Sequence, residues 1–172
     1  MKVIFLDIDC VLVTEGRHGF GIMLEPKNLK RLKWISKKTG AKIVLTTGLQ
    51  CSNVHNKSSQ FHAIAMQYGI KVYDYTFTAK SNGLSYGYYE IQSWLDIHPS
   101  VKNIVVLDNH NVNMGCLEKY TVHTSFDGSK DGLLRWRDNG FSTKKAREAV
   151  KMLNISYVNV YKPQIAVDRE KF

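Results

Sequence analysis

Three short apolar segments of this chain each end in polar or acidic side chains. They are rich in β-branched residues, which is typical of strands buried on both faces of a parallel sheet. Parallel strands require crossover connections, so the pattern predicts an α/β fold with a central parallel sheet. The segments are residues 3–6 (VIFL), 42–47 (KIVLTT) and 103–109 (NIVVLDN).

The first segment is followed by two carboxylates, Asp7 and Asp9. Carboxylates beside a buried strand are costly without a partner, and a divalent cation would offset that cost. Mg²⁺ prefers hard oxygen ligands. Residues i and i+2 of an extended chain point the same way, so both carboxylates can reach one site. The alternative is that the two acids cap the following helix or face water.

The other two segments bring Thr46 and Asp108 to the ends of their strands. Ligands of open α/β sheets bind at the carboxyl ends of the strands. A strand ending in Asp7, another in Thr46 and a third in Asp108 therefore predict one site at that edge of the sheet.

These residues resemble the motifs of the haloacid dehalogenase-like superfamily of Mg²⁺-dependent phosphohydrolases. The triplet Asp7-Ile8-Asp9 matches the first motif, Thr46 the second and Asp108 the fourth. The resemblance is strongest to a small branch found in RNA-repair proteins, and it extends over roughly three-quarters of the chain. The strings that carry it are Phe5–Leu12 (FLDIDCVL), Lys42–Gln50 (KIVLTTGLQ), Tyr86–Leu95 (YGYYEIQSWL) and Val105–Met114 (VVLDNHNVNM).

The resemblance implies a three-layer Rossmann-like fold with a central parallel sheet and a minimal cap or none. Residues 13–23 are polar and rich in glycine, and they stand where the superfamily carries a flap. This insert is too short for a cap domain. An open site of this kind favours a bulky substrate, such as a phosphate presented by a macromolecule.

The resemblance also implies roles for individual side chains. Asp7 would attack phosphorus and form an aspartyl-phosphate, while Asp9 would act as general acid and then as general base. Thr46 would donate a hydrogen bond to a phosphoryl oxygen. Lys80 is the candidate for the basic residue of the third motif, and the alternative is that it is a solvated loop lysine.

The implied cofactor is Mg²⁺, held by Asp7, Asp108 and the backbone carbonyl of Asp9, with Asn109 as a further oxygen donor. Asn109 and Asn113 replace acids of the fourth motif, so the site has fewer negative charges than is usual in the superfamily. The alternative for Asn109 is a hydrogen bond within a turn, as asparagine often forms after a strand.

Three further departures from the superfamily pattern lie in the other motifs. Cys10 stands where the first motif has glycine, and we interpret it as a small buried side chain. The run 47–50 (TGLQ) replaces a serine-tryptophan-arginine run, and Tyr86 stands where an arginine is common.

The function predicted from these motifs is that of a Mg²⁺-dependent phosphatase, a phosphoric monoester hydrolase. Its expected substrates are phosphate monoesters, with nucleic-acid ends and nucleotides as candidates. The alternative is a phosphate- or nucleic-acid-binding protein that retains the fold and has weakened catalysis. The sequence specifies neither the substrate nor the oligomeric state.

The composition bears on partners and location. The formal net charge of +9 favours a polyanionic partner. Lysine and arginine are densest at residues 27–38 and 144–151, although such clusters are most often solvated helix faces. There is no apolar run of about 18 residues, so no membrane span is expected. An odd cysteine count of three and a start that leads directly into a strand predict a cytoplasmic protein without a signal peptide.

The chain is predicted to form a single domain over residues 1–172, with 154–172 as a C-terminal extension. Helix 25–39 is expected to bury a face formed by Leu29, Leu32, Trp34 and Ile35. The remaining expected helices are 59–68, 88–97 and 142–153, and the remaining strands are 70–75 and 120–124. Residues 156–161 are expected to be a strand or a tail, and 50–59, 77–85 and 125–132 are expected to be loops.

Overall fold

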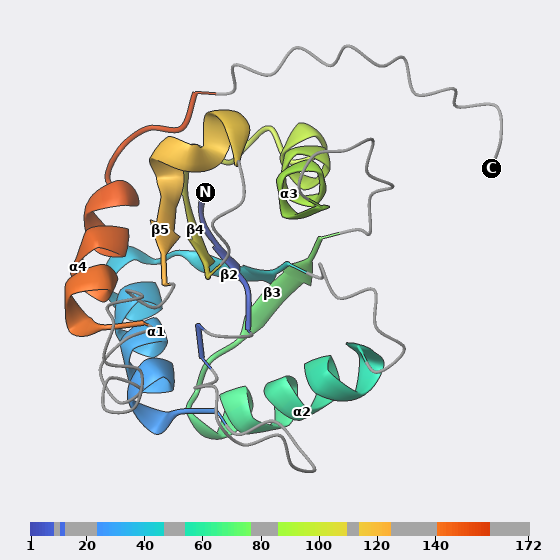
Figure 1. Cartoon of the computed structure of the whole chain (residues 1–172), viewed down its shortest axis with the longest axis vertical. Coiled ribbons are helices and arrows are strands. Elements are labelled where there is room, and N and C mark those ends of the chain that lie inside the picture. The colour runs from blue at the N-terminus through green and yellow to red at the C-terminus, as the bar shows by residue number, and fades with distance from the viewer. Residues whose placement is uncertain are drawn as a thin grey trace, which may run out of the picture.

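The computed structural model describes residues 1–8, 11–12, 24–46, 54–76, 86–109, 114–124 and 141–158, without the side chains of 54–60 and 86. Its centre is a five-stranded sheet in the order β3-β2-β1-β4-β5, in which every pair of neighbours is parallel (Figure 1). The predicted α/β fold is therefore confirmed. The strands are β1 (Lys2–Leu6), β2 (Lys42–Leu45), β3 (Val72–Tyr75), β4 (Asn103–Asp108) and β5 (Thr121–His123).

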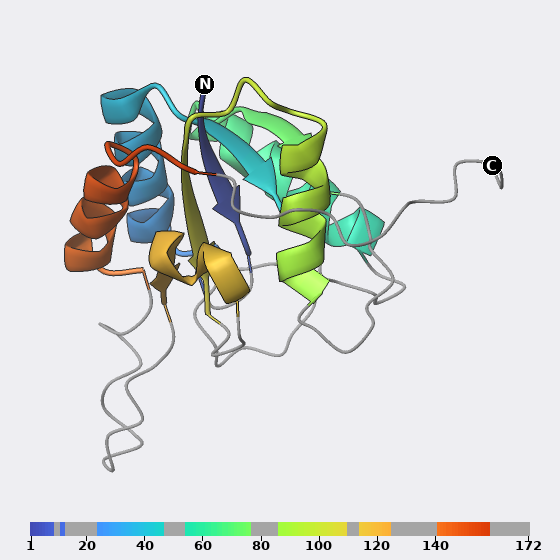
Figure 2. The ribbon, with the colours of Figure 1, turned by 90° about the horizontal axis from the view of Figure 1, so that it is seen from above.

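Helices cover both faces of this sheet and complete a three-layer, Rossmann-like arrangement (Figures 1 and 2). On one face lie α1 (Pro26–Thr39), α2 (Val54–Gln67) and α4 (Thr143–Met152). On the other face lie α3 (Tyr86–Asp96) and the 3₁₀ helix η1 (Gly115–Tyr120).

The alternation of side chains along β1 divides the interior into two cores. Ile4 and Leu6 pack toward α1, α2 and α4, whereas Val3 and Phe5 pack toward α3 and η1. All four side chains are fully buried. A strand buried on both faces reads as a continuous apolar run, which is why the sequence pattern predicted it correctly.

The ends of α1 follow the expected signals. Pro26 occupies the first turn, where its missing N–H costs nothing, and Glu25 precedes it in extended conformation. Gly40 ends the helix in the left-handed region at a φ of 69°, and its N–H donates to the carbonyl of Ser36. At the start of α4, Ser142 Oγ accepts a hydrogen bond from the Lys145 N–H at 3.3 Å, as predicted.

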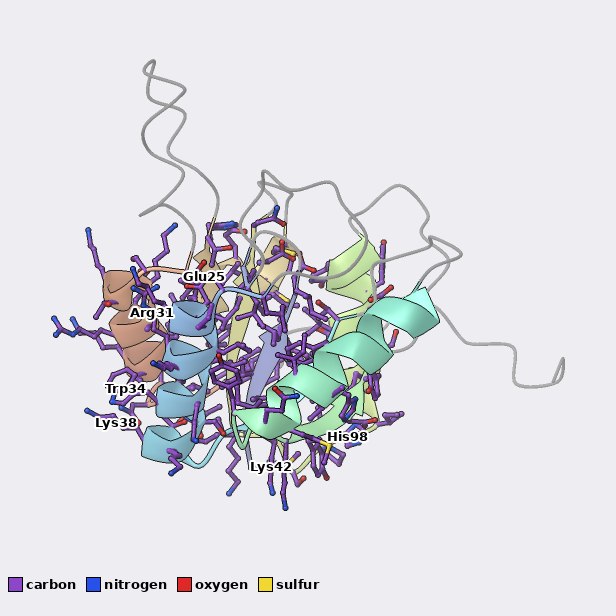
Figure 3. The ribbon with its side chains drawn as sticks, turned by 90° about the horizontal axis from the view of Figure 1, so that it is seen from below. Glu25, Arg31, Trp34, Lys38, Lys42 and His98 are labelled. Atoms are coloured by element: carbon purple, nitrogen blue, oxygen red, sulfur yellow. The ribbon has the colours of Figure 1, made fainter. Side chains whose placement is uncertain are left out.

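Two expectations about the helices were wrong. The second helix begins at Val54, not near residue 59. The sequence pattern missed its first turns because they are polar and resemble a loop. Trp34 was assigned to the buried face of α1, but 41% of its surface is exposed (Figure 3). At 100° per residue, Trp34 lies well away from Leu32 around the helix, and the buried face consists of Asn28, Leu29, Leu32 and Ile35.

The segment that follows α4 runs along the amino end of β4. The Tyr157 N–H donates to the Lys102 carbonyl at 2.6 Å, and Asn103 Nδ2 donates to the Ile155 carbonyl at 2.8 Å. The Tyr157 ring lies 5.3 Å from that of Tyr120, and burial raises the pKa of Tyr157 to about 12. Up to Val158 the segment is not a strand, and its assignment as an extension of a single domain stays a prediction.

No helix in the described ranges is both long and apolar enough to cross a membrane. The expected flap over 13–23, the loops over 77–85 and 125–132, and Cys10 lie outside the residues that the structure describes.

Candidate active site at the carboxyl ends of the strands

Asp7, Thr46 and Asp108 lie side by side at the carboxyl edge of the sheet. The last residue of β1, Leu6, is in register with Leu45 of β2 and Leu107 of β4. The next residue of each strand therefore falls in one row, with Asp7 in the middle. Because neighbouring strands are about 4.8 Å apart, these side chains share one small region.

Backbone hydrogen bonds hold this row beyond the ends of the strands. The Asp7 N–H donates to the Leu107 carbonyl at 3.0 Å, and the Thr46 N–H donates to the Leu6 carbonyl at 3.0 Å. Each of these residues thus remains in the parallel ladder, which limits how far its side chain can move. The row is consequently an extension of the rigid sheet.

The three side chains also belong to the same face of the sheet. Side chains alternate along a strand, and Asp7, Thr46 and Asp108 share the phase of Phe5, Val44 and Val106 respectively. Those three apolar residues pack toward α3 and η1. Asp7, Thr46 and Asp108, which match the first, second and fourth motifs, therefore lie on the face that α3 and η1 cover. Thr46 and Asp108 are buried, and Asp7 is partly exposed.

Asn109 adds an oxygen next to Asp108. Its Oδ1 is buried and has no hydrogen-bond partner among the residues that the structure describes. The donors of a turn hydrogen bond to this oxygen would belong to residues 110–113, which lie outside the described residues, so the two interpretations of Asn109 both stay predictions. A buried carbonyl oxygen without a donor is suited to a cation, so the donor set of Asp7, Asp108 and Asn109 fits the oxygen preference of Mg²⁺.

The remaining predicted site residues, Asp9 and Lys80, lie outside the described residues, so their roles stay predictions. Among the residues that are described, no group of three or more histidine, cysteine, aspartate and glutamate side chains could hold a metal. Because Asp9 lies outside the described ranges, the structure describes two of the acids predicted for the site, Asp7 and Asp108.

A buried acid that the sequence analysis missed lies at the end of the same row. Register with β2 places Thr76, the residue after β3, beside Thr46. Thr76 Oγ1 donates to Glu90 Oε2 of α3 at 3.1 Å, and Glu90 is fully buried. The signal available in the sequence was an acid one position before Ile91 and four before Trp94, on the inward face of a predicted helix.

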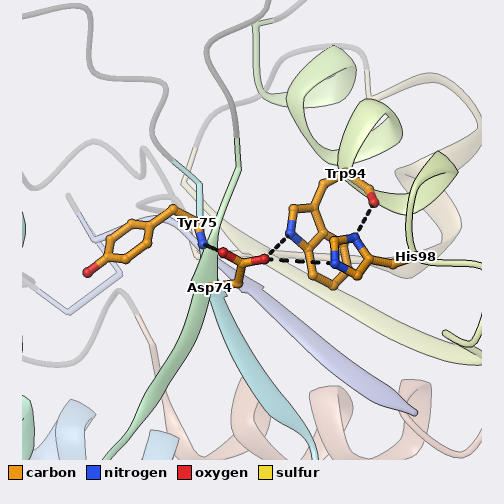
Figure 4. Close-up of polar contacts among 4 residues, drawn as sticks. All are labelled: Asp74, Tyr75, Trp94 and His98. Atoms are coloured by element: carbon orange, nitrogen blue, oxygen red, sulfur yellow. Dashed lines mark hydrogen bonds and ion pairs between the residues drawn. The ribbon is translucent and has the colours of Figure 1, made fainter.

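A second contact fixes α3 to β3 (Figure 4). Trp94 Nε1 donates to Asp74 Oδ2 at 2.8 Å. Asp74 and Thr76 are two residues apart on the strand, Trp94 and Glu90 four apart on the helix, and the two spacings are nearly equal at about 6–7 Å. Because the later helix residue, Trp94, contacts the earlier strand residue, Asp74, α3 runs antiparallel to β3. We call these two hydrogen bonds the clasp.

His98 extends this clasp at the carboxyl end of α3 (Figure 4). Its ring stacks on Trp94 with centroids 3.7 Å apart, and its Nδ1 donates to the Trp94 carbonyl at 2.7 Å. This hydrogen bond requires the proton on Nδ1, since a carbonyl can only accept. His98 Nε2 then faces Asp74 Oδ2 at 3.9 Å.

A further polar pair lies at the end of β3, on the face toward α2. Tyr75 Oη and His62 Nδ1 are 2.6 Å apart. Burial raises the pKa of Tyr75, so its hydroxyl stays protonated at neutral pH. The sequence offered no motif for this pair.

A parallel sheet with a central aspartate at its carboxyl edge, an adjacent threonine and a second aspartate on the next strand defines a haloacid dehalogenase-like domain. A family model described as the HAD domain in Swiss Army Knife RNA repair proteins matches residues 3–132. The chain belongs to this family, as the motif resemblance indicated, and a phosphohydrolase-type function in the broad sense follows. Neither the curated proteins nor the solved structures gave a match.

Proposed function

We propose that the protein is a Mg²⁺-dependent phosphatase that hydrolyses phosphate monoesters through an aspartyl-phosphate, with nucleic-acid ends and nucleotides as candidate substrates. The observation that supports this most is the row Thr46–Asp7–Asp108 on one face of the sheet edge. A nucleophile with a hydrogen-bond donor on one side and an acid on the other is the arrangement that phosphoryl transfer to a carboxylate requires.

In the proposed mechanism, the Asp7 carboxylate attacks phosphorus and the P–O bond to the leaving group breaks. Asp9 protonates the departing oxygen, and later takes a proton from the water that cleaves the aspartyl-phosphate. Thr46 and Lys80 donate hydrogen bonds to the phosphoryl oxygens and stabilise their charge. Asp7, Asp108, Asn109 and the Asp9 carbonyl would hold Mg²⁺, which when bound neutralises negative charge on the phosphoryl group.

The direct test is phosphate release from a generic aryl phosphate with and without Mg²⁺. We expect turnover with Mg²⁺ and its loss in excess EDTA, because the phosphoryl charge is then uncompensated. Undiminished turnover in EDTA would contradict the proposal. A panel of 3′- and 5′-phosphorylated oligonucleotides, mononucleotides and sugar phosphates then distinguishes among the candidate substrates.

A second prediction concerns the charge of the metal site. Asn109→Asp adds a carboxylate beside Asp108, so we expect Mg²⁺ to bind the free protein about tenfold more tightly. Asp108→Asn removes one and should weaken binding by about tenfold or more. Calorimetric titration of Mg²⁺ into each purified variant measures both changes.

The matched control is Asn154→Asp, which makes the same charge change far from the site. Asn154 Oδ1 accepts a hydrogen bond from Lys2 Nζ at 3.0 Å, at the amino end of β1. This variant should bind Mg²⁺ as the parent protein does. If Asn109→Asp behaves like Asn154→Asp while Asp108→Asn abolishes binding, then Asn109 is not a ligand.

The neutral side chain of Asn109 also supports a second candidate function, that of a phosphate- or nucleic-acid-binding protein with weakened catalysis. Fewer anions at the site lower the affinity for the cation and so reduce turnover. This alternative predicts that the protein binds a phosphorylated ligand but does not hydrolyse it, even when Mg²⁺ is saturating. The turnover assay above separates the two functions.

A further inference from the structure

The positive charge of the chain is concentrated on two helices. Helices α1 and α4 together contain ten lysine and arginine residues and one acid, Glu148. Their net charge of +9 equals the formal net charge of the whole chain, so the rest of the sequence is neutral on balance. The concentration on two elements distinguishes this charge from a general excess of lysine.

These two helices pack side by side on one face of the sheet (Figure 3). Arg31 of α1 joins them, because its Nη1 donates to the Phe141 carbonyl just before α4 at 2.9 Å and to Asn28 Oδ1 at 2.8 Å. The buried sides of both helices are apolar apart from Asn28, so their charges lie toward the outside. The exposed basic residues are Lys27, Lys30, Lys37 and Lys38 of α1, and Lys144, Arg147 and Lys151 of α4. We call these seven residues the basic face.

An aromatic side chain lies within the basic face. Trp34 is 41% exposed, and the Lys38 ammonium group lies 5.0 Å from the centroid of its ring. Arg31, Trp34 and Lys38 follow one another along the side of α1 next to α4 (Figure 3). Within the described part of the chain, none of the exposed lysines of α1 forms an ion pair, so their charges are available to a partner.

We propose that the basic face binds the phosphate backbone of a nucleic acid, with Trp34 as a stacking surface for a base. Helix α1 is about 20 Å long, which spans several successive phosphates. Lysines beside an exposed aromatic ring are the arrangement that binds single strands without sequence preference. A membrane surface fits less well, because Trp34 is the only large apolar side chain exposed on α1 and α4, whereas interfacial helices bury a broad apolar face.

The basic face begins near the edge of the sheet that carries Asp7. Asn28 Nδ2 donates to the Val11 carbonyl at 2.9 Å, and the Leu12 N–H donates to the Ile8 carbonyl at 3.0 Å. The first turn of α1 is therefore tied to the segment that leaves Asp7. A strand lying along the basic face would have one end close to the candidate active site.

The test measures binding apart from catalysis. The probe is a fluorescein-labelled 20-nucleotide single-stranded RNA without terminal phosphates, followed by fluorescence anisotropy in EDTA at about 0.1 M NaCl. We expect the triple variant K144Q/R147Q/K151Q to bind at least about tenfold more weakly. The slope of log affinity against log salt concentration should be less steep by about 2, because each of the three lost phosphate contacts contributes about 0.7 to the slope.

The matched control, K42Q/K71Q/K102Q, removes the same charge from exposed lysines at the amino ends of the strands. It should lose less than about threefold, since these lysines lie at the far edge of the sheet. Trp34→Leu should weaken single-strand binding about tenfold and duplex binding far less, since stacking needs an unpaired base. Circular dichroism checks that each variant is folded.

Two results would overturn the proposal. An equal loss in the two triple variants would mean that only net charge matters, and binding to phosphatidylserine vesicles without binding to the RNA would identify a membrane surface. The inference goes beyond the proposed phosphatase activity and does not depend on it, because the probe has no phosphomonoester and the buffer no divalent cation. Aryl phosphatase activity, measured in parallel, should be unchanged in all three variants.

Discussion

Replacing Asp7 by asparagine is expected to reduce phosphate release on the order of 10⁴-fold or more and to abolish the phosphoenzyme. The amide is nearly the same size as the carboxylate but is neutral and a poor nucleophile. The Asp7 N–H donates a hydrogen bond to the Leu107 carbonyl, and Asp7 lies at the centre of the row, between Thr46 and Asp108. Acid quenching with a radiolabelled substrate detects the covalent phosphate directly.

Two further variants give this result its meaning. Asp9→Asn should retain Mg²⁺ binding, since only its carbonyl is the expected ligand, and slow turnover by about 10²–10⁴-fold as the general acid is lost. Asp96→Asn makes the same chemical change at the far end of α3 and should leave the rate unchanged. A phosphoenzyme that persists in Asp7→Asn would exclude Asp7 as the nucleophile.

The second large effect expected is on stability. Trp94→Ala should lower the free energy of unfolding by about 3–5 kcal/mol, because it removes a fully buried ring and leaves a cavity. The ring packs edge-on against Phe5 with centroids 5.4 Å apart, and its N–H is the donor to Asp74 in the clasp. Trp94→Phe keeps most of the packing and should cost about 1 kcal/mol for the lost hydrogen bond to Asp74, whose carboxylate stays accessible to water. Urea unfolding followed by circular dichroism measures both.

Trp34→Ala is the matched control, the same substitution at a tryptophan on the surface. Because 41% of its surface is exposed, Trp34 should contribute less to stability than Trp94 does, about 1–2 kcal/mol. Equal losses at the two tryptophans would mean that Trp34 is buried in solution, which would also weaken the stacking role proposed for it. If Trp94→Ala does not fold, Trp94→Phe still tests the bond to Asp74.

The sheet could be predicted from sequence because parallel strands buried on both faces leave a strong apolar signal. Residues 3–6, 42–45 and 103–108 were each found in this way. The start of α2 was missed because nothing in its polar first turns distinguishes a helix from a loop. The position of Trp34 was predicted wrongly because it was assigned to the buried face for its hydrophobic character. Its angular position around the helix places it on the outside.

The part of the site that lies at the ends of the strands could be predicted from the order of the motifs. Asp7, Thr46 and Asp108 were predicted to lie together, and their shared face follows from register, which the sequence does not reveal. Glu90 could not be assigned to the row, because its contact with Thr76 depends on how α3 is placed over the sheet. Such contacts arise from tertiary packing and have no local sequence signal.

The clasp between β3 and α3 also bears on self-association. β3 is an edge strand, and edge strands can pair with a second chain through their free backbone N–H groups. The Thr76 N–H points inward to Leu45, so the preceding N–H, that of Tyr75, points outward. Asp74 Oδ1 accepts it at 2.8 Å, while Oδ2 of the same carboxylate holds Trp94. One carboxylate thus anchors a helix and occupies a donor that strand addition would need, which protects this edge from intermolecular pairing.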